Sequence, residues 1–223
     1  MNGRLKPWLI RAGLCCGVLA PVLWAATIVL AGELRPGFDH ASQYISELGE
    51  RGSRTEVFMR YGSFVPTGLM HAAFAAAFGA LLVRRGNDVV ITALVTLLIA
   101  LDGFGRVGAG LFSCEPGCAS PEVFSQRVHN LTATVAFFSI IIATLLAPRV
   151  FRHHARLRPL KAYSFLSGCA AIIFLVLMRT SEATGVATGT YERLATGVLS
   201  LWVLVVAVRL WPLVEPTRPP RPG

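Results

Sequence analysis

The chain has 223 residues, of which 54% are hydrophobic and only 15% are charged. Soluble domains carry about 25% charged residues, so this charged fraction and the mean hydropathy of +0.59 argue against a soluble protein. Six apolar stretches each approach the 20 or so residues that cross a bilayer core, which leaves roughly 100 residues for loops and tails. These proportions exclude a large catalytic domain outside the membrane.

The six stretches are predicted to be membrane-spanning helices, because lipid offers the backbone no hydrogen-bonding partner. The predicted fold class is therefore all-α, a polytopic membrane protein with six transmembrane helices. The first stretch is longer than the apolar core of about 7–15 residues in a cleaved signal peptide, so it is expected to remain as a helix. In chain order the stretches are 12–31, 61–83, 89–111, 127–147, 162–180 and 194–211.

The distribution of Lys and Arg predicts the orientation. Most of the 21 basic residues lie in the N-terminus, in the loops after the second and fourth spans, and in the tail. The positive-inside rule then places both termini in the cytoplasm, with the protein in the cell membrane. We expect a cytoplasmic N-terminus over 1–11, one transmembrane domain over 12–211 and a Pro-rich cytoplasmic tail over 212–223. Membrane lipids are the expected surroundings, and basic clusters without interleaved aromatic residues do not indicate a nucleic-acid partner.

The first outer loop, residues 32–60, is long for a connector and is predicted to contain a short helix. Asp39 can cap its start and Gly49 can end it. Ser46 and Glu47 lie off its apolar stripe, so the simplest expectation is an amphipathic helix at the membrane interface with its polar side in water. The alternative is that this polar side covers a cavity between the spans. The stripe consists of Ala41, Tyr44, Ile45 and Leu48.

The third loop contains two cysteines separated by a Glu-Pro-Gly turn. Cys114 and Cys118 face the outer side in the predicted topology, which favours a disulfide. A reduced or metal-binding pair is the alternative, and the spacing is not that of a Cys-x-x-Cys redox motif. Ser120 followed by Pro121 is typical of a helix start and predicts the beginning of the fourth helix.

Ionisable residues occur within the spans, toward their outer halves. Charges at that depth cost roughly 2.5–3.5 kcal/mol or more and are usually paired or functional. Arg106 follows Asp102 by four residues, so the two can pair on one helix face. Together with His71 and His129, these groups either form interhelical pairs or line one polar cavity that opens outward.

Four short segments occur in a characteristic order along the chain. They are Ile45-Ser-Glu-Leu-Gly49, Gly110-Leu-Phe112, His129 and Tyr191-Glu-Arg-Leu194. Together they resemble the domain of unknown function 998 family of prokaryotic six-helix integral membrane proteins, over about residues 12–211. The resemblance implies six helices and an outer site, and it supplies no activity. Family members commonly continue after Gly-Leu-Phe with Pro-Thr-Asp, where this chain has Ser113-Cys114-Glu115.

Three functions are compatible with these features. The first is an outward-facing polar cavity that binds or moves a small or lipid-like ligand, in which an arginine with histidines would suit an anionic head group. The second is a membrane hydrolase that holds zinc on His71, Asp102 and His129, although the His-x-x-x-His motif of ceramidase-like enzymes is absent. The third is a non-catalytic assembly or sensing subunit. No other cofactor motif is evident. The cavity candidates are Ser46, Glu47, His71, Asp102, Arg106, Glu115 and His129.

Overall fold

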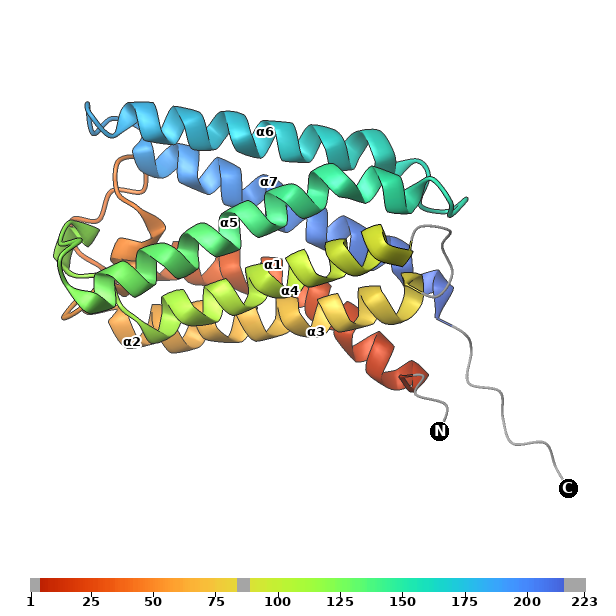
Figure 1. The fold of residues 1–223 in the computed structure, drawn as a ribbon. Coiled ribbons are helices and arrows are strands. Elements are labelled where there is room, and N and C mark those ends of the chain that lie inside the picture. Colours follow the sequence, from red (N-terminus) through yellow and green to blue (C-terminus); the bar gives the residue numbers. More distant parts are fainter. Residues whose placement is uncertain (1–4, 84–88, 215–223) are drawn as a thin grey trace, which may run out of the picture.

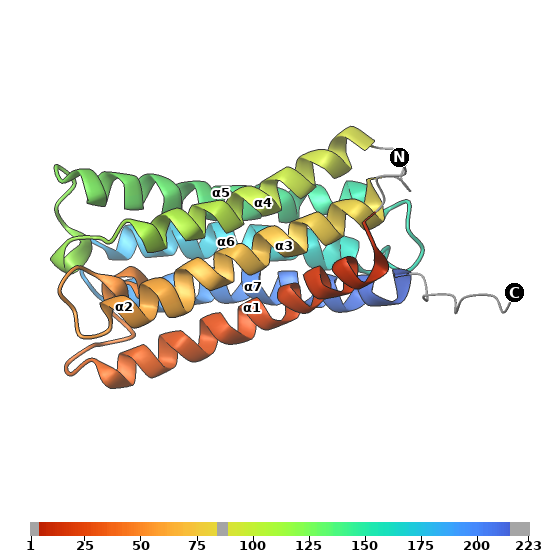
Figure 2. The same cartoon turned by 90° about the horizontal axis from the view of Figure 1, so that it is seen from below.

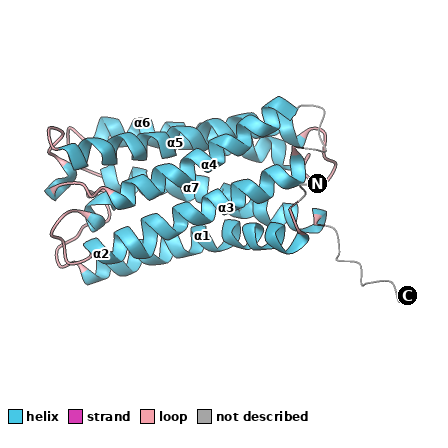
Figure 3. Ribbon diagram, turned by 60° about the horizontal axis from the view of Figure 1, so that its bottom comes forward, coloured by secondary structure: helices cyan, strands magenta, loops and turns pink. Residues whose placement is uncertain are grey.

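The computed structural model describes residues 5–83 and 89–214, and within them it contains helices and loops but no strand (Figure 3). Six helices are long and apolar enough to cross a membrane, which confirms the predicted fold class. The second of them is continuous through three pieces, namely α2, a π-helical turn η2 and α3. The bounds are α1 Pro7–Leu34, α2 Glu56–Met59, η2 Arg60–Phe64, α3 Val65–Leu82, α4 Val89–Leu111, α5 Phe124–Phe151, α6 Leu160–Ser181 and α7 Thr188–Leu210.

The six helices form a closed ring (Figure 1). Each one packs on the next in the order α1, α3, α4, α5, α6 and α7, and α7 returns to α1. Seen from below, α3 lies between α1 and α4 (Figure 2). We call the end where α1 begins and α7 ends the terminal end, and the opposite end, where α4 ends and α5 begins, the loop end. The connecting loops 35–55 and 112–123 both lie at the loop end (Figure 1).

Glycines bring the backbones of α3, α4 and α5 into direct contact. A Cβ atom on Gly68 of α3 would lie 2.5 Å from the carbonyl oxygen of Gly103 in α4. A Cβ atom on Gly105 of α4 would lie 2.6 Å from the carbonyl oxygen of Thr132 in α5. Lipid provides no hydrophobic drive for helix association, so this close packing is a main source of cohesion among these helices.

Large apolar side chains fill the terminal half of the ring. Phe74, Phe78, Phe151 and Trp202 are all completely buried there. The indole Nε1 of Trp202 donates a hydrogen bond of 2.9 Å to Oγ of Ser164, which links α7 to α6. The interior is therefore closed toward the terminal end, and the buried polar groups described below lie in the loop half.

Pro66 explains the π-helical turn in the second span. Proline has no backbone N–H and cannot donate to the carbonyl four residues earlier. The irregular turn η2, Arg60–Phe64, lies directly before it. Such turns commonly occur at functional sites, and this one places Phe64 against the interior cavity.

Two expectations about the loops are corrected. The helix expected from Asp39 to Gly49 is only a 3-10 turn, η1 (Ile45–Gly49), because Asp39 caps a separate turn by accepting the N–H of Ala41 at 2.9 Å. Helix α5 begins at Phe124 rather than at Ser120–Pro121, since those residues form a turn of their own. Arg84 and Arg85, residues 1–4 of the expected N-terminus and residues 215–223 of the expected tail lie outside the described residues.

Candidate functional site

A cavity of about 750 Å³ occupies the loop half of the ring. This volume lies within the range of known ligand sites, about 300–1,000 Å³. Helices α1, α4, α5, α6 and α7 contribute to its wall, and η1 and the short turn η3 (Pro116–Cys118) contribute to its loop-end side. Its polar lining residues are Tyr44, Ser46, Asp102, Arg106, His129, Asn130, Thr134, Arg179, Glu182, Glu192 and Thr196.

Asp102 organises the polar groups on the α4 side of the cavity. Its side chain is 1% exposed, and both of its oxygens are occupied. Oδ2 is paired with Nδ1 of His71 on α3, and Oδ1 accepts a hydrogen bond of 3.1 Å from Nε of Arg106. A buried carboxylate is tolerated only with such partners, so Asp102 fixes the position of Arg106 while His71 supports Asp102 from behind.

Arg106 is held by Asp102 and by an aromatic ring, which leaves most of its donors unused. Its Cζ atom lies 4.9 Å from the ring centroid of Trp24 on α1, a cation–π distance. Within residues 5–83 and 89–214, neither Nη atom of Arg106 has a hydrogen-bonding partner. Nε1 of Trp24 is also buried without a partner in the described part of the chain. The cavity wall therefore contains a largely buried guanidinium fork and an indole N–H for which the described residues provide no acceptor.

His129 joins the start of α5 to the end of α4. Its Nδ1 atom lies 3.0 Å and 2.9 Å from the carbonyl oxygens of Ala109 and Phe112. Because carbonyl oxygens only accept hydrogen bonds, Nδ1 carries a proton, and in the neutral ring Nε2 is then an acceptor. The carbonyls at a helix C-terminus need such donors. His129 therefore caps the C-terminus of α4, and it also contributes a polar edge to the cavity.

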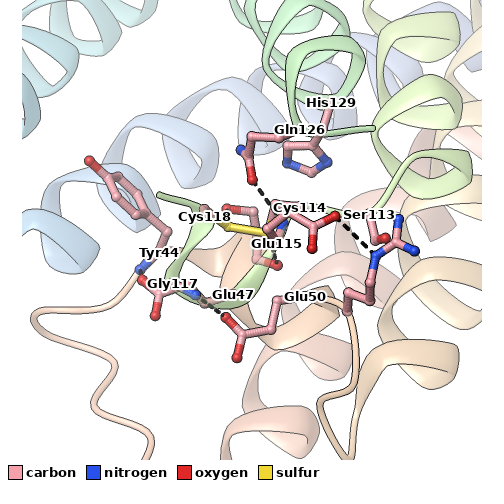
Figure 4. Close-up of a disulfide and its surroundings, with 12 residues drawn as sticks. Tyr44, Glu47, Glu50, Ser113, Cys114, Glu115, Gly117, Cys118, Gln126 and His129 are labelled. Atoms are coloured by element: carbon pink, nitrogen blue, oxygen red, sulfur yellow. Dashed lines mark hydrogen bonds and ion pairs between the residues drawn. A yellow bond between two sulfur atoms is a disulfide. The ribbon is translucent and has the colours of Figure 1, made fainter. Parts of the chain in front are cut away.

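The disulfide loop and η1 together form a roof over the cavity, which we define as residues 44–50 and 114–118. Figure 4 shows the disulfide and the side chains around it. The structure joins Cys114 to Cys118, which agrees with the disulfide expected for two cysteines that face the outer side. The two halves of the roof are bonded to each other, since Glu50 accepts the N–H of Gly117 at 2.7 Å. Ser46 Oγ lies 3.3 Å from Sγ of Cys118, and both residues line the cavity. The loop thus covers a cavity, as in the alternative expectation, but the lining comes from Tyr44 and Ile45 of the apolar stripe as well as from Ser46, and Glu47 does not line it.

Two further contacts attach the roof to α6 and α7. The Tyr44 hydroxyl donates to Oε1 of Glu182 at 2.6 Å, and Oε2 of Glu192 accepts the N–H of Ile45 at 2.6 Å. Burial, reinforced by the hydrogen bond to Glu182, raises the pKa of Tyr44 well above its ordinary value. The Tyr44 hydroxyl therefore stays protonated and remains a donor at every physiological pH.

The structure brings together some of the residues that the sequence singled out. Ser46, Asp102, Arg106 and His129 line one cavity, and His71 lies directly behind Asp102. The other two candidates have different partners and do not line it.

Glu47 and Glu115 are engaged in the roof itself. Glu47 accepts the N–H of Tyr44 at 2.9 Å and the side-chain amide of Gln43 at 2.7 Å, so it shapes the 3-10 turn. Glu115 pairs with Arg51 at 3.0 Å. These two carboxylates therefore stabilise the loops and do not form part of the cavity wall.

Sequence reasoning did not identify Trp24, Tyr44 or Glu192 as lining residues. Trp24 lies within an apolar span, where nothing in the sequence distinguishes it from a lipid-facing tryptophan. Tyr44 was assigned to an apolar stripe on the basis of spacing alone. Glu192 did carry a signal, because it belongs to the Tyr191-Glu-Arg-Leu194 segment, but as an isolated acid at a helix start it resembled a surface charge.

The chain matches the family model described as protein of unknown function DUF998 over residues 18–209, which is most of its length. It belongs to this family. No curated protein and no solved structure matches the chain. Because the family description states no activity, the function of this DUF998 protein must be argued from its cavity.

The geometry gives the zinc hypothesis no support. Among the described residues of this DUF998 protein, no group of three or more His, Cys, Asp or Glu side chains is arranged to hold a metal ion. Asp102 is paired with both His71 and Arg106, and the Nδ1 of His129 is directed at two carbonyl oxygens. A catalytic zinc requires about three protein ligands around one point, and these three residues do not meet that requirement.

Proposed function

We propose that this DUF998 protein binds a small or lipid-like ligand with an anionic group in the cavity beneath the roof. The protein would sit in the cell membrane with both termini in the cytoplasm, so that the loop end faces outward. This orientation follows from the positive-inside rule applied to the basic loops.

The observation that carries the proposal is the state of Arg106. Its side chain is 9% exposed, and Asp102 uses only its Nε. The two Nη atoms present four N–H groups to the cavity, and the described residues provide no acceptor for them. Beside them, the buried Nε1 of Trp24 has no partner in the described part of the chain, and such a buried donor costs about 1–3 kcal/mol. An anionic oxygen pair would satisfy the N–H groups of Arg106 in the planar, two-pronged geometry that arginine offers to carboxylates and phosphates.

The neighbours of Arg106 fit a ligand with further polar atoms. Trp24 adds a donor through Nε1. Glu192 and His129 add acceptors, because within the described residues Glu192 bonds only through Oε2 and His129 only through Nδ1. These groups lie on α1, α5 and α7, so a ligand in contact with them would bridge three helices of the ring.

Ligand retention after purification tests the proposal. Wild type and Arg106→Gln, purified in mild detergent, are compared by native mass spectrometry for bound small molecules. We expect a bound anionic species in the wild type and its loss in Arg106→Gln. Arg127→Gln is the matched control, because Arg127 lies on α5 near the same end but is exposed and does not line the cavity. Equal retention in all three proteins would refute the proposed function.

A further inference from the structure

The cavity is open sideways, between α5 and α6, beneath the roof. Phe138 of α5 and Ile172 and Val176 of α6 line it, and yet they are 58%, 41% and 56% exposed. Residues that are both lining and exposed mark a gap through which the cavity reaches the outer surface of the ring. Figure 1 shows α5 close to α6 near the turn that joins them and diverging from it toward the loop end.

This side opening faces lipid rather than water. Helices α5 and α6 both have the length and composition of membrane-spanning helices. Ile172 lies nine residues before the end of α6 at Ser181, which places it about 14 Å below that end. Half of a bilayer core is about 15 Å thick. The apolar part of the cavity, lined by Phe138, Ile172 and Val176, therefore extends over about the depth of one lipid leaflet.

The polar part of the cavity around Arg106 lies just below the level of the lipid head groups. Arg106 is five residues before the end of α4 at Leu111, so it lies about 8 Å below the loop end of its helix. The 23 residues of α4 span about 35 Å, slightly more than the bilayer core of about 30 Å. The guanidinium is thus a few ångströms inside the boundary between head groups and hydrocarbon.

We propose that the ligand is a phospholipid of the outer leaflet with an anionic head group that also carries hydroxyl donors, and that it enters through the gap between α5 and α6. This inference rests on the proposed function. The phosphate binds the Nη atoms of Arg106, and the hydroxyl groups donate to Glu192 and His129. The acyl chain lies against Phe138, Ile172 and Val176.

Head-group chemistry rather than chain length selects the ligand. Lipid tails are as apolar as leucine side chains, so moving an acyl chain from the bilayer into the gap yields little free energy. The gap instead provides a path along which an amphiphile can bring its charge to Arg106 without carrying its chain through water. A water-soluble anion gains nothing from this path.

The test uses two tryptophan variants on α6 with matched exposure. Val176→Trp adds bulk in the gap, whereas Ile173→Trp adds the same bulk on a neighbouring residue that is 57% exposed but does not line the cavity. Each protein is incubated with vesicles of phosphatidylglycerol and phosphatidylcholine, purified, and assayed for retained lipid by native mass spectrometry. Binding of glycerol 3-phosphate, a head group without chains, is measured in parallel.

We expect wild type and Ile173→Trp to retain phosphatidylglycerol in preference to phosphatidylcholine, and Val176→Trp to retain about tenfold less. Equal retention by Val176→Trp and Ile173→Trp would overturn the lateral path. Glycerol 3-phosphate binding with no lipid retained in any protein would overturn the lipid assignment while leaving the anion site intact. The Arg106→Gln variant tests the anion site of the proposed function separately. It should abolish the binding of both phosphatidylglycerol and glycerol 3-phosphate.

Discussion

Replacing Asp102 with alanine should destabilise the protein more than any exposed substitution. The carboxylate is buried between His71 and Arg106, so its removal leaves the Arg106 guanidinium at membrane depth without a counter-charge. Breaking a buried ion pair by deleting one partner costs about 3–5 kcal/mol. For a chain of this size that loss corresponds to a fall of roughly 6–20 °C in Tm. Tryptophan fluorescence during thermal unfolding in detergent provides the measurement.

Two further variants distinguish the effect of breaking the ion pair from the effect of losing side-chain packing. Glu122→Ala removes an exposed carboxylate at the loop end and should change stability by less than about 0.5 kcal/mol. The double variant Asp102→Ala with Arg106→Met removes both charges, so it should recover part of the loss through a coupling of about 1–3 kcal/mol. The buried ion pair has no such role if Asp102→Ala has the same Tm as the wild type, or if the double variant loses as much stability as both single variants together.

Three other predictions follow from contacts elsewhere. Gly105→Ala should lower Tm, since its Cβ would lie 2.6 Å from a backbone oxygen of α5, whereas Gly197→Ala, with nothing within 4 Å, should leave it unchanged or raise it. Cys114→Ser should lower the free energy of unfolding by about 2 kcal/mol, because it opens the five-residue ring that the disulfide closes. The measurement is the Tm difference from wild type, which a reducing agent should abolish. Burial and the Arg193 guanidinium lower the pKa of His40. The folded state therefore holds that proton less tightly than the unfolded chain, and stability should fall as the pH drops below about 6.5. A Tm series from pH 8 to pH 5 should show a smaller fall for His40→Gln, and an equal fall would contradict this assignment.

The architecture was predictable because its main determinant is local. A run of about 20 apolar residues can cross a bilayer only as a helix, and the predicted third span, 89–111, coincides with α4. The second span is less regular, because Pro66 places a π-helical turn inside it, and its helix begins at Glu56, before the apolar stretch that starts at residue 61. Helix starts in the loops were missed wherever Asp39 or Ser120 forms an independent turn that resembles a cap.

The site was only partly predictable, because side-chain partners are a tertiary property. The four-residue spacing of Asp102 and Arg106 correctly indicated a pair, which the structure contains. No sequence pattern relates His71 to Asp102 across two helices, or shows that Glu47 and Glu115 are used within the roof. The amphipathic stripe of the first loop was also misleading, since Ile45 and Leu48 of the roof pack in an interior cluster with Trp24 rather than on lipid.

The most direct test of the central claim is a crystal structure of the wild-type protein grown in a lipid mesophase doped with phosphatidylglycerol. We predict phosphate density within hydrogen-bonding distance of the two Nη atoms of Arg106, with chain density leaving the cavity between α5 and α6. A cavity that contains only water, with Arg106 paired to another protein group, would contradict the account.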